Sequence, residues 1–297
     1  MKTVVIVNGI SKHYKSFTKQ LAGISRIDRV LTTKASGEAE KMARDSIDAE
    51  LELLIIAGGD GTLNEVINGI LGSDSRAPML AICPIGSAND YARNLNTQTI
   101  EQLIESALEK KCNAVDAISI RSGNRIRYLC NVSAAGIGAE IAATVNARRF
   151  RMNATWNYYS AILRWLSSYR APLVKIKLNE LEITQRCFLA AIGKGTYAGN
   201  GLGLLPQVGL SDGMLGLTIA GNINVFDFLM FQGRLKKAKR IIDPRVQYLS
   251  AKRIELEVLD GTLAIDADGE YQFQLAQGES AVFEILPSVL KLINKEA

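Results

Sequence analysis

The sequence predicts an α/β domain with a three-layer parallel sheet, followed by a mainly antiparallel β-sandwich domain. Up to about residue 121, short apolar runs alternate with segments of helical spacing, which is typical of a parallel sheet covered by helices. Beyond that point, apolar runs follow one another across Gly, Asn and Asp turns, which is typical of antiparallel strands. We therefore expect one domain from residues 1–121 with residues 287–297, and a second from residues 122–286.

The expected elements follow from hydrophobic spacing. In the first domain we expect strands at residues 3–8, 29–33, 53–57, 79–83 and 113–120, and helices at 17–21, 37–47, 62–70 and 99–109. In the second domain we expect helices at residues 154–168 and 225–239, and strands at 125–132, 174–178, 182–192, 214–219, 252–259, 263–267 and 280–286. Residues 287–297 are predicted to form a short helix that packs back on the first domain.

Composition excludes several classes of protein. Of the 297 residues, 47% are hydrophobic and 22% charged, as in globular proteins, and no apolar stretch reaches the ~18 residues of a membrane span. The single histidine, His13, excludes a two-histidine metal site and weakens Ser-His-Asp chemistry. Four spread cysteines without a CxxC pair favour reduced thiols in a cytosolic protein. The net charge of +5 suits phosphates or anionic lipid and is too weak to indicate nucleic acid.

The stretch LLIIAGGDGTLNEVIN, residues 53–68, is the centre of the first domain. It predicts a buried strand, a tight turn and a helix. Gly58, Gly59 and Gly61 leave no Cβ between the backbone and a ligand, and a helix N-terminus favours an anion. Asp60 beside an anion requires a bridging cation, so a metal–nucleotide complex fits. The alternative is a plain strand-to-helix turn with Thr62 as N-cap.

A second chemical segment is PIGSANDYAR, residues 84–93. Gly86 and Ser87 at a strand end can hold a phosphate, while Asn89 and Asp90 can orient a substrate hydroxyl or cap a helix. Arg93 lies one turn later on the face of Asn89. The alternative is a capped helix start. The loop at residues 8–12 also carries amide, hydroxyl and ammonium groups at a strand end, where open α/β sheets bind ligands.

The third chemical segment is DADGE, residues 266–270. Its carboxylates lie on a turn, where one of them could accept a hydroxyl proton. The alternative is an ordinary hairpin turn, because Asp-Gly is a strong turn signal.

Together these segments resemble the diacylglycerol-kinase catalytic-domain family, particularly its small soluble bacterial lipid kinases, which are related to sphingosine kinases. Residues 58–65 look like the family's ATP loop, and residues 86–93 look like its second block, where Thr usually stands in place of Ser87. Residues 200–215 look like its glycine-rich loop and Asp-Gly-x-Leu segment, and residues 268–270 like its Asp-Gly-Glu turn. GGDGT alone is shared with NAD kinases and phosphofructokinases, whose first-domain fold we expect here. The combination is more specific and covers essentially the whole chain.

The resemblance implies an ATP-dependent kinase that phosphorylates the hydroxyl of diacylglycerol or a related lipid, with Mg²⁺ and with the nucleotide between the domains. Glu270 matches the position of the general base, and Asp60 a position that relatives use for Mg²⁺ or as the base. Asn89, Asp90 and Arg93 are expected to bind the substrate. The expected nucleotide-binding residues are Asn8, Gly9, Ile10, Ser11, Lys12, Thr33, Gly58, Gly59, Asp60, Gly61, Thr62, Leu63, Asn64 and Ser87.

The resemblance also implies a structural Mg²⁺, held by Asp212 with the backbone carbonyls of Gly209 and Met214. Two departures from the family pattern bear on these sites. Gly9 stands where the family usually has Pro, and we expect the first loop to be more flexible as a result. Gly216 stands where an Asp often follows the Asp-Gly-x-Leu segment, so a carboxylate near the structural metal is missing.

Access to a lipid would come from aromatic and basic residues at 148–170 and from a basic cluster at 234–240. We expect a cytoplasmic protein in peripheral contact with an anionic membrane; the alternative for residues 154–168 is a core helix. An edge strand of the second domain could pair across a homodimer. Two other functions stay open: an NAD-kinase-like kinase of a soluble substrate, disfavoured by the segments at 89–93 and 268–270, and a non-catalytic nucleotide- or lipid-binding homologue, disfavoured by Asp60 and Glu270.

Overall fold

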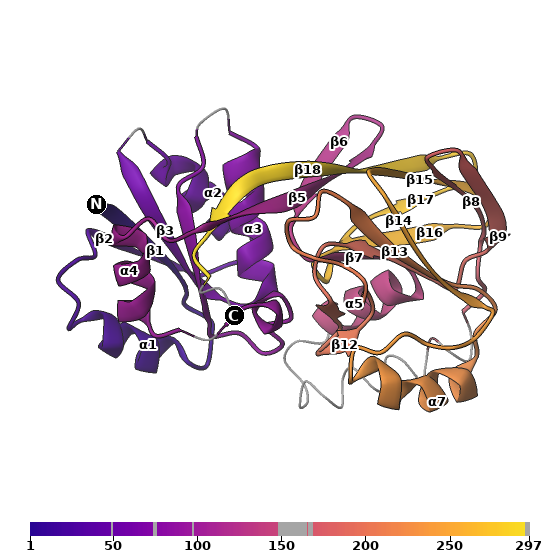
Figure 1. Ribbon diagram of the computed structural model, residues 1–297, viewed down its shortest axis with the longest axis horizontal. Coiled ribbons are helices and arrows are strands. Elements are labelled where there is room, and N and C mark those ends of the chain that lie inside the picture. The colour runs from indigo at the N-terminus through magenta and orange to yellow at the C-terminus, as the bar shows by residue number, and fades with distance from the viewer. Residues whose placement is uncertain (49, 74–75, 97, 148–164, 166–168, 295–297) are drawn as a thin grey trace. The chain divides into compact units, whose positions relative to one another are not determined.

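The computed structural model describes residues 1–48, 50–73, 76–96, 98–147, 165 and 169–294. The chain divides into two compact units (Figure 1): unit 1 is Met1–Ala117 with Pro287–Ala297, and unit 2 is Ile118–Leu286. The predicted fold class is confirmed, since unit 1 has a parallel sheet with helices and unit 2 has antiparallel strands. Within the described residues, no helix is both long and apolar enough to cross a bilayer.

Unit 1 contains four parallel strands in the order β2-β1-β3-β4. Its strands are β1 (Lys2–Asn8), β2 (Arg29–Thr33), β3 (Leu51–Gly58) and β4 (Met79–Pro84). Its helices are α1 (Tyr14–Leu21), α2 (Glu38–Ser46), α3 (Asp60–Leu71), the 3₁₀ turn Tyr91–Asn94 and α4 (Ile100–Leu108). β5 (Asn113–Ser122) then begins in unit 1 and ends in unit 2.

The inner strands β1 and β3 are buried on both faces over most of their length, which explains their nearly continuous apolar runs, whereas the edge strand β2 is partly exposed. On one face, Val5, Ile55 and their neighbours share a core with Phe17 of α1 and Leu103 of α4. Side chains alternate along a strand, so the equally buried Ile56 points to the other face, where α3 lies against β3. Because the four strands are parallel, their carboxyl ends lie at the same edge of the sheet. That edge carries the loops predicted to be functional.

The C-terminal segment is a strand and not the predicted helix. β18 (Ser280–Leu292) runs through it, and Lys291 and Leu292 pair in parallel with Met79 and Leu80 of β4. The prediction was wrong because the apolar residues at 289, 290, 292 and 293 are compatible with either period over so short a segment. Pairing with β4 decides the outcome, since it satisfies backbone groups that a helix would have left at the sheet edge.

Unit 2 is a sandwich of two sheets. One sheet has the order β14-β13-β10-β7-β16-β17, and the other is formed by β18, β15, β8 and β9 with the β5–β6 hairpin beside β18. The strands are β6 (Arg125–Leu129), β7 (Val132–Gly136), β8 (Leu173–Leu178), β9 (Leu181–Arg186), β10 (Leu189–Gly193), β11 (Tyr197–Ala198), β12 (Leu202–Gly203), β13 (Leu215–Ala220), β14 (Val246–Ala251), β15 (Arg253–Asp260), β16 (Leu263–Ala267) and β17 (Glu270–Leu275). Among the described residues of unit 2, the helices are α5 (Ile137–Ala147) and α7 (Val225–Leu235).

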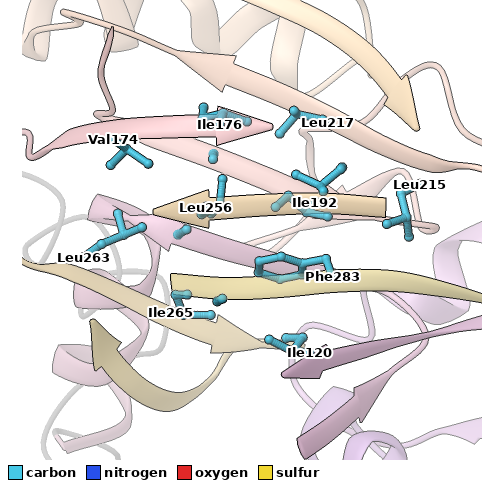
Figure 2. Close-up of a cluster of buried hydrophobic side chains, with 14 of the residues drawn as sticks. Ile120, Val174, Ile176, Ile192, Leu215, Leu217, Leu256, Leu263, Ile265 and Phe283 are labelled. Carbon is cyan, nitrogen blue, oxygen red and sulfur yellow. The ribbon is translucent and has the colours of Figure 1, made fainter. Parts of the chain in front are cut away.

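Alternating side chains from the two sheets fill the sandwich. Figure 2 shows Ile176, Leu256 and Phe283 of one sheet close to Ile192 and Leu217 of the other, and all five are fully buried. The strand predicted at 125–132 is interrupted after Leu129, and β7, α5, β14 and β17 were not predicted. The helix predicted at 154–168, apart from Trp165, lies outside the described residues, as does much of the interface predicted at 148–170.

Removing the Phe283 ring should destabilise unit 2 strongly. Phe283 has no exposed surface, so Phe283→Ala leaves a cavity and is expected to lower the free energy of unfolding by about 3–5 kcal/mol. Urea unfolding monitored by circular dichroism measures the change. The exposed neighbour Glu284→Ala is the control and should shift the midpoint little. A loss below about 1 kcal/mol for Phe283→Ala would contradict the described core packing.

Candidate active site

The first loop of the candidate site connects β3 to α3. The helix begins at Asp60 with Gly59 at the N-cap position, so Thr62 is not the N-cap that the alternative interpretation required. A Cβ on Gly58 would lie 2.4 Å from the Cβ of Thr62, so only glycine fits that position. The Thr62 side chain turns inward, and its hydroxyl accepts a hydrogen bond from Asn8 Nδ2 at 3.2 Å. The Thr62 side chain therefore lies beneath the turn and leaves the backbone of the turn presented at the strand ends.

The second loop, which follows β4, approaches the first loop backbone to backbone. A Cβ on Gly86 would lie 2.3 Å from the Cα of Gly59, and one on Gly59 would lie 3.1 Å from the Cα of Gly86. Asn89, in the left-handed region with φ +52°, holds the turn by accepting from Gly86 N at 3.0 Å and donating to Gly86 O at 3.1 Å. Asp90 precedes the 3₁₀ turn without capping it through its side chain.

Asp60 ties these two loops together. One carboxylate oxygen accepts from the backbone N–H of Asp90 and the other from that of Tyr91, both at 3.0 Å. Arg93 stays within its own loop, with Nε 3.3 Å from Asp90 Oδ1 and Nη2 donating to Ala88 O at 3.4 Å. A small hollow is lined by residues of both loops and the strands before them: Ile56, Gly58, Gly59, Asp60, Leu63, Ile82, Pro84, Asn89, Tyr91 and Ala92.

The loop after β1 is fixed more firmly than the presence of Gly9 suggested. Gly9 N donates to Thr33 O at 3.1 Å, a bond that proline could not make, and a Cβ on Gly9 would lie 2.4 Å from that oxygen. Ser11 Oγ donates to Ile85 O at 2.5 Å, which joins this loop to the second loop. Ile10 and Lys12 are exposed at its tip.

The predicted nucleotide residues of unit 1 thus gather at the carboxyl ends of β1, β2, β3 and β4, although some side chains point away. Thr33, Leu63 and Asn64 are each at most 5% exposed, and Asn64 is bonded to Asn68 one turn later. Ser87 is exposed. One supporting residue was not predicted: Glu65 accepts from Gly37 N at 2.8 Å and Ala39 N at 3.0 Å, and so fixes the start of α2.

The acidic hairpin between β16 and β17 is the candidate site of unit 2. Asp268, with φ +51°, is buried, and its Oδ1 accepts from the backbone N–H of Asn131 and of Val132, both at 3.1 Å. Asp266 is also buried, and its Oδ1 accepts from Ala134 N at 2.7 Å. Glu270 is the partly exposed member of the three. Within the described residues, no three His, Cys, Asp or Glu side chains come together as a metal site.

One carboxyl group of this hairpin, that of Asp266, has a strongly raised pKa. Burial raises the pKa of Asp266 to about 8, the N–H of Ala134 lowers it, and the neighbouring charges of Asp268 and Glu270 raise it again. Asp266 is therefore largely protonated at neutral pH, which reduces the repulsion that three adjacent charges would create.

At the predicted structural Mg²⁺ site, the side chain of Lys194 holds the position expected for a cation. Its ammonium bonds to Asp212 Oδ1 and donates to Met214 O at 2.9 Å. Gly209 presents its N–H, not its carbonyl, to Asp212 Oδ2 at 3.1 Å. Burial raises the pKa of Asp212, but Lys194 and the N–H groups of Met214 and Gly209 lower it further, to below its usual value. This arrangement does not fit a divalent ion on Asp212, Gly209 and Met214.

Comparison with known proteins is consistent along the whole chain. Residues 2–120 match the family model described as the diacylglycerol kinase catalytic domain, and residues 131–294 match the YegS C-terminal NAD kinase beta sandwich-like domain. The chain belongs to the diacylglycerol kinase family. It is therefore a phosphotransferase with an alcohol group as acceptor, of the lipid kinase class.

Named relatives of this lipid kinase agree with the assignment. It is 29% identical over 239 residues to a diacylglycerol kinase of Bacillus subtilis, covering 80% of this chain and 78% of the relative. It is 27% identical to a YegS-like lipid kinase of Chromohalobacter salexigens over 99% and 93% of the two chains. A diacylglycerol kinase structure from Bacillus anthracis superposes with TM-score 0.71 at 22% identity, covering 99% of this chain and 97% of that one. An NAD kinase from Archaeoglobus fulgidus, solved with ATP, gives TM-score 0.55 at 14% identity, covering 99% and 94%. These two structures support the fold.

Substituting Gly86 should separate the two loops of the lipid kinase. Gly86→Ala places a methyl group against Gly59 Cα, so the loops must move apart, and we expect at least a tenfold loss of nucleotide affinity. Calorimetric titration with ATP measures the loss. Gly233→Ala is the control, because nothing lies within 4 Å of its added Cβ. Unchanged ATP affinity in Gly86→Ala would show that the loop contact is not needed.

The buried Asp266 should make the stability of unit 2 depend on pH. Its pKa is raised in the folded state, so its stabilising contribution is complete below about pH 4 and is lost as pH rises towards about 8. Asp266→Asn can still accept from Ala134 N but does not titrate. The free energy of unfolding of Asp266→Asn, relative to that of wild type, should therefore rise between about pH 4 and about pH 8, by at most about 1.4 kcal/mol per pH unit. Urea unfolding from pH 4 to 8 measures the difference, with exposed Asp45→Asn as control. Parallel curves for wild type and Asp266→Asn would contradict it.

Proposed function

We propose that this lipid kinase transfers the γ-phosphoryl group of ATP, with Mg²⁺, to the hydroxyl of diacylglycerol or a closely related lipid. The observation that supports it best is the contact between Gly59 and Gly86, with Asp60 bonded across both loops. Phosphoryl transfer depends mainly on positioning and charge neutralisation, and not on covalent catalysis. A rigid surface of backbone amides meets that need better than a set of mobile side chains.

The unit 1 loops fit a triphosphate in three ways. Gly59 and Gly86 have no Cβ, which would otherwise fill the space where the two backbones meet. The N–H groups in the first turn of α3 have no carbonyl acceptor within the helix and are available to an anion. The helix dipole also favours an anion at this end. The backbone of residues 8–12, 33 and 58–64 and the hydroxyl of Ser87 would hold ATP. Each Asp60 oxygen that accepts one N–H keeps a second lone pair, so Asp60 would hold Mg²⁺, which neutralises charge on the phosphates.

On the acceptor side, we propose Glu270 as the general base. Asp266 and Asp268 are buried and bonded to the backbone, whereas Glu270 is partly exposed on the same hairpin. A carboxylate of ordinary basicity suffices, because the hydroxyl proton leaves late in a loose transition state. Asn89, Asp90 and Arg93 stay predicted substrate-binding residues; through their hydrogen bonds they shape the second loop.

Because the acceptor is a membrane lipid, we also propose that the kinase acts in the cytoplasm in peripheral contact with an anionic membrane. The predicted homodimer stays a prediction. NAD kinases share the fold at lower structural similarity than the diacylglycerol kinases, so phosphorylation of NAD is tested as the alternative reaction.

Glu270→Gln should abolish most lipid phosphorylation while leaving the fold intact. We expect kcat to fall by about 10²–10⁴-fold with little change in KM for ATP, because only proton removal is affected. The measurement is transfer from γ-labelled ATP to diacylglycerol, monoacylglycerol, phosphatidylglycerol, a sphingoid base and a polyprenol in mixed micelles. NAD is the control acceptor.

The matched control is Glu284→Gln, an exposed carboxylate on β18 that has no part in the proposed site. Its activity should equal that of wild type. Labelled NADP without labelled lipid would move the protein to the NAD-kinase-like alternative. ATP binding without any labelled product would overturn the proposed reaction. Full activity in Glu270→Gln would overturn Glu270 as the base.

A further inference from the structure

Helix α7 is apolar on two opposite sides. On the side that faces the rest of unit 2, Phe228, Phe231 and Leu235 pack with Leu202 and Ile241. Away from it, Phe226 is 77% and Met230 76% exposed, with Leu229 at 52%, and Ile242, shortly after the helix, is 83% exposed. Figure 1 shows α7 (orange) outside the strands of unit 2. We call Phe226, Leu229, Met230 and Ile242, with the cations described next, the α7 surface.

Cations accompany these exposed apolar side chains. Arg234 in the last turn of the helix is exposed, as are the residues between the helix and Ile242: Lys236, Lys237, Lys239 and Arg240. The nearby carboxylates, Asp227 and Asp243, are both bound by Arg245, at 2.9 and 2.8 Å. Arg245 offsets one of these two negative charges, and the five exposed cations outnumber the one that remains. The surface therefore presents apolar groups beside net positive charge.

We propose, on the basis of the lipid kinase function above, that the α7 surface docks on an anionic phospholipid bilayer. Protruding Phe and Met side chains can enter the headgroup region, while lysine and arginine next to them are attracted to anionic lipid. Exposed Phe and Met at these fractions are costly in water, and the excess of cations favours a negatively charged occupant. The docked helix would bring unit 2, which carries Glu270, to the membrane that contains the acceptor lipid.

Vesicle binding tests this surface directly. Wild type should sediment with vesicles of phosphatidylcholine and phosphatidylglycerol, and at least tenfold more weakly with phosphatidylcholine alone or at high salt. Phe226→Ser with Met230→Ser should reduce binding to anionic vesicles at least tenfold. The matched control replaces two exposed apolar residues elsewhere in unit 2, Ile126→Ser with Leu181→Ser, and should bind like wild type.

Activity measured in two formats separates this surface from the reaction itself. The α7 double variant should phosphorylate a lipid embedded in vesicles several-fold more slowly, but a short-chain, monomerically dispersed lipid at the wild-type rate. Unchanged vesicle binding of the double variant, or loss of a dimer in solution as its only effect, would overturn the docking surface. Vesicle binding that depends on α7, with no lipid phosphorylated in either format, would overturn the proposed function and leave the docking surface standing.

A second observation concerns Lys194, which is independent of α7. Its side chain is 0% exposed, although a lysine is seldom buried without a specific partner. The ammonium lies against the Asp212 carboxylate and the Met214 carbonyl, and its backbone N–H donates to Asn131 O at 2.8 Å. Asn131 in turn donates its N–H to Asp268 on the acidic hairpin. Lys194 thus connects the Asp212 loop to the segment that holds that hairpin.

We infer that Lys194 is a built-in cation that replaces a structural divalent ion at the Asp212 loop. An ammonium provides a positive charge and directed donors to the same carboxylate and carbonyl oxygens that a hard cation would use. The Gly209 N–H facing Asp212 supports this, because a metal would repel a donor there. Unit 2 therefore folds without metal, and a requirement for Mg²⁺ belongs to the nucleotide.

Thermal unfolding of the nucleotide-free protein tests this inference. The midpoint of wild type should be the same in EDTA and in Mg²⁺, and Lys194→Met should lower it by roughly 5 °C or more. Lys177→Met, which removes a partly exposed ion pair with Glu255, is the control and should shift it far less. Two results would overturn the inference. The first is that Mg²⁺ stabilises wild type and Asp60→Asn but not Asp212→Asn. The second is that Lys194→Met unfolds at the same midpoint as wild type.

Discussion

The close approach of two glycines is the constraint on which the rest of unit 1 depends. Gly59 and Gly86 meet without side chains, and Asp60 accepts N–H groups of the second loop across that contact. The Ser11 hydroxyl adds the loop after β1 to the same assembly. Three loops from separate strands thus form one continuous backbone surface. Such a surface can hold phosphate oxygens with little reorganisation, because its amides are already ordered by the sheet beneath them.

The acidic hairpin shows how one short segment gives its carboxyl groups different properties. Asp268 accepts two backbone N–H hydrogen bonds and so fixes the turn. Asp266 is buried and raised in pKa, so it adds little negative charge beside its neighbours. Glu270, partly exposed, is the member left at the surface. Position in the hairpin, and not residue type, separates two buried carboxyl groups that accept backbone N–H groups from one that is partly exposed.

Features that the sequence predicted well leave a pattern within a short stretch of chain. Features that it missed depend on contacts with residues far away in the sequence. The glycine loops were recognisable because glycines follow apolar runs at strand ends, and the parallel sheet because strands and helices alternate. β7, with the sequence VSAAG, has few strand-forming side chains and is a strand only because β10 and β16 lie beside it. The role of Lys194 could not be seen, since it arises only when the Asp212 loop, 18 residues away in the sequence, folds against it.

The path of β18 has a consequence for how the protein is made. Unit 1 is discontinuous: its sheet is completed by Lys291 and Leu292, and Ile293 fills its core after the whole of unit 2 has been passed. During synthesis the first 117 residues therefore leave the ribosome with one edge of β4 unpaired and part of their core missing. An unpaired strand edge is prone to wrong pairing. The residues that close unit 1 are translated after all of unit 2, so the enzyme can complete the fold of unit 1 only once unit 2 has been synthesised.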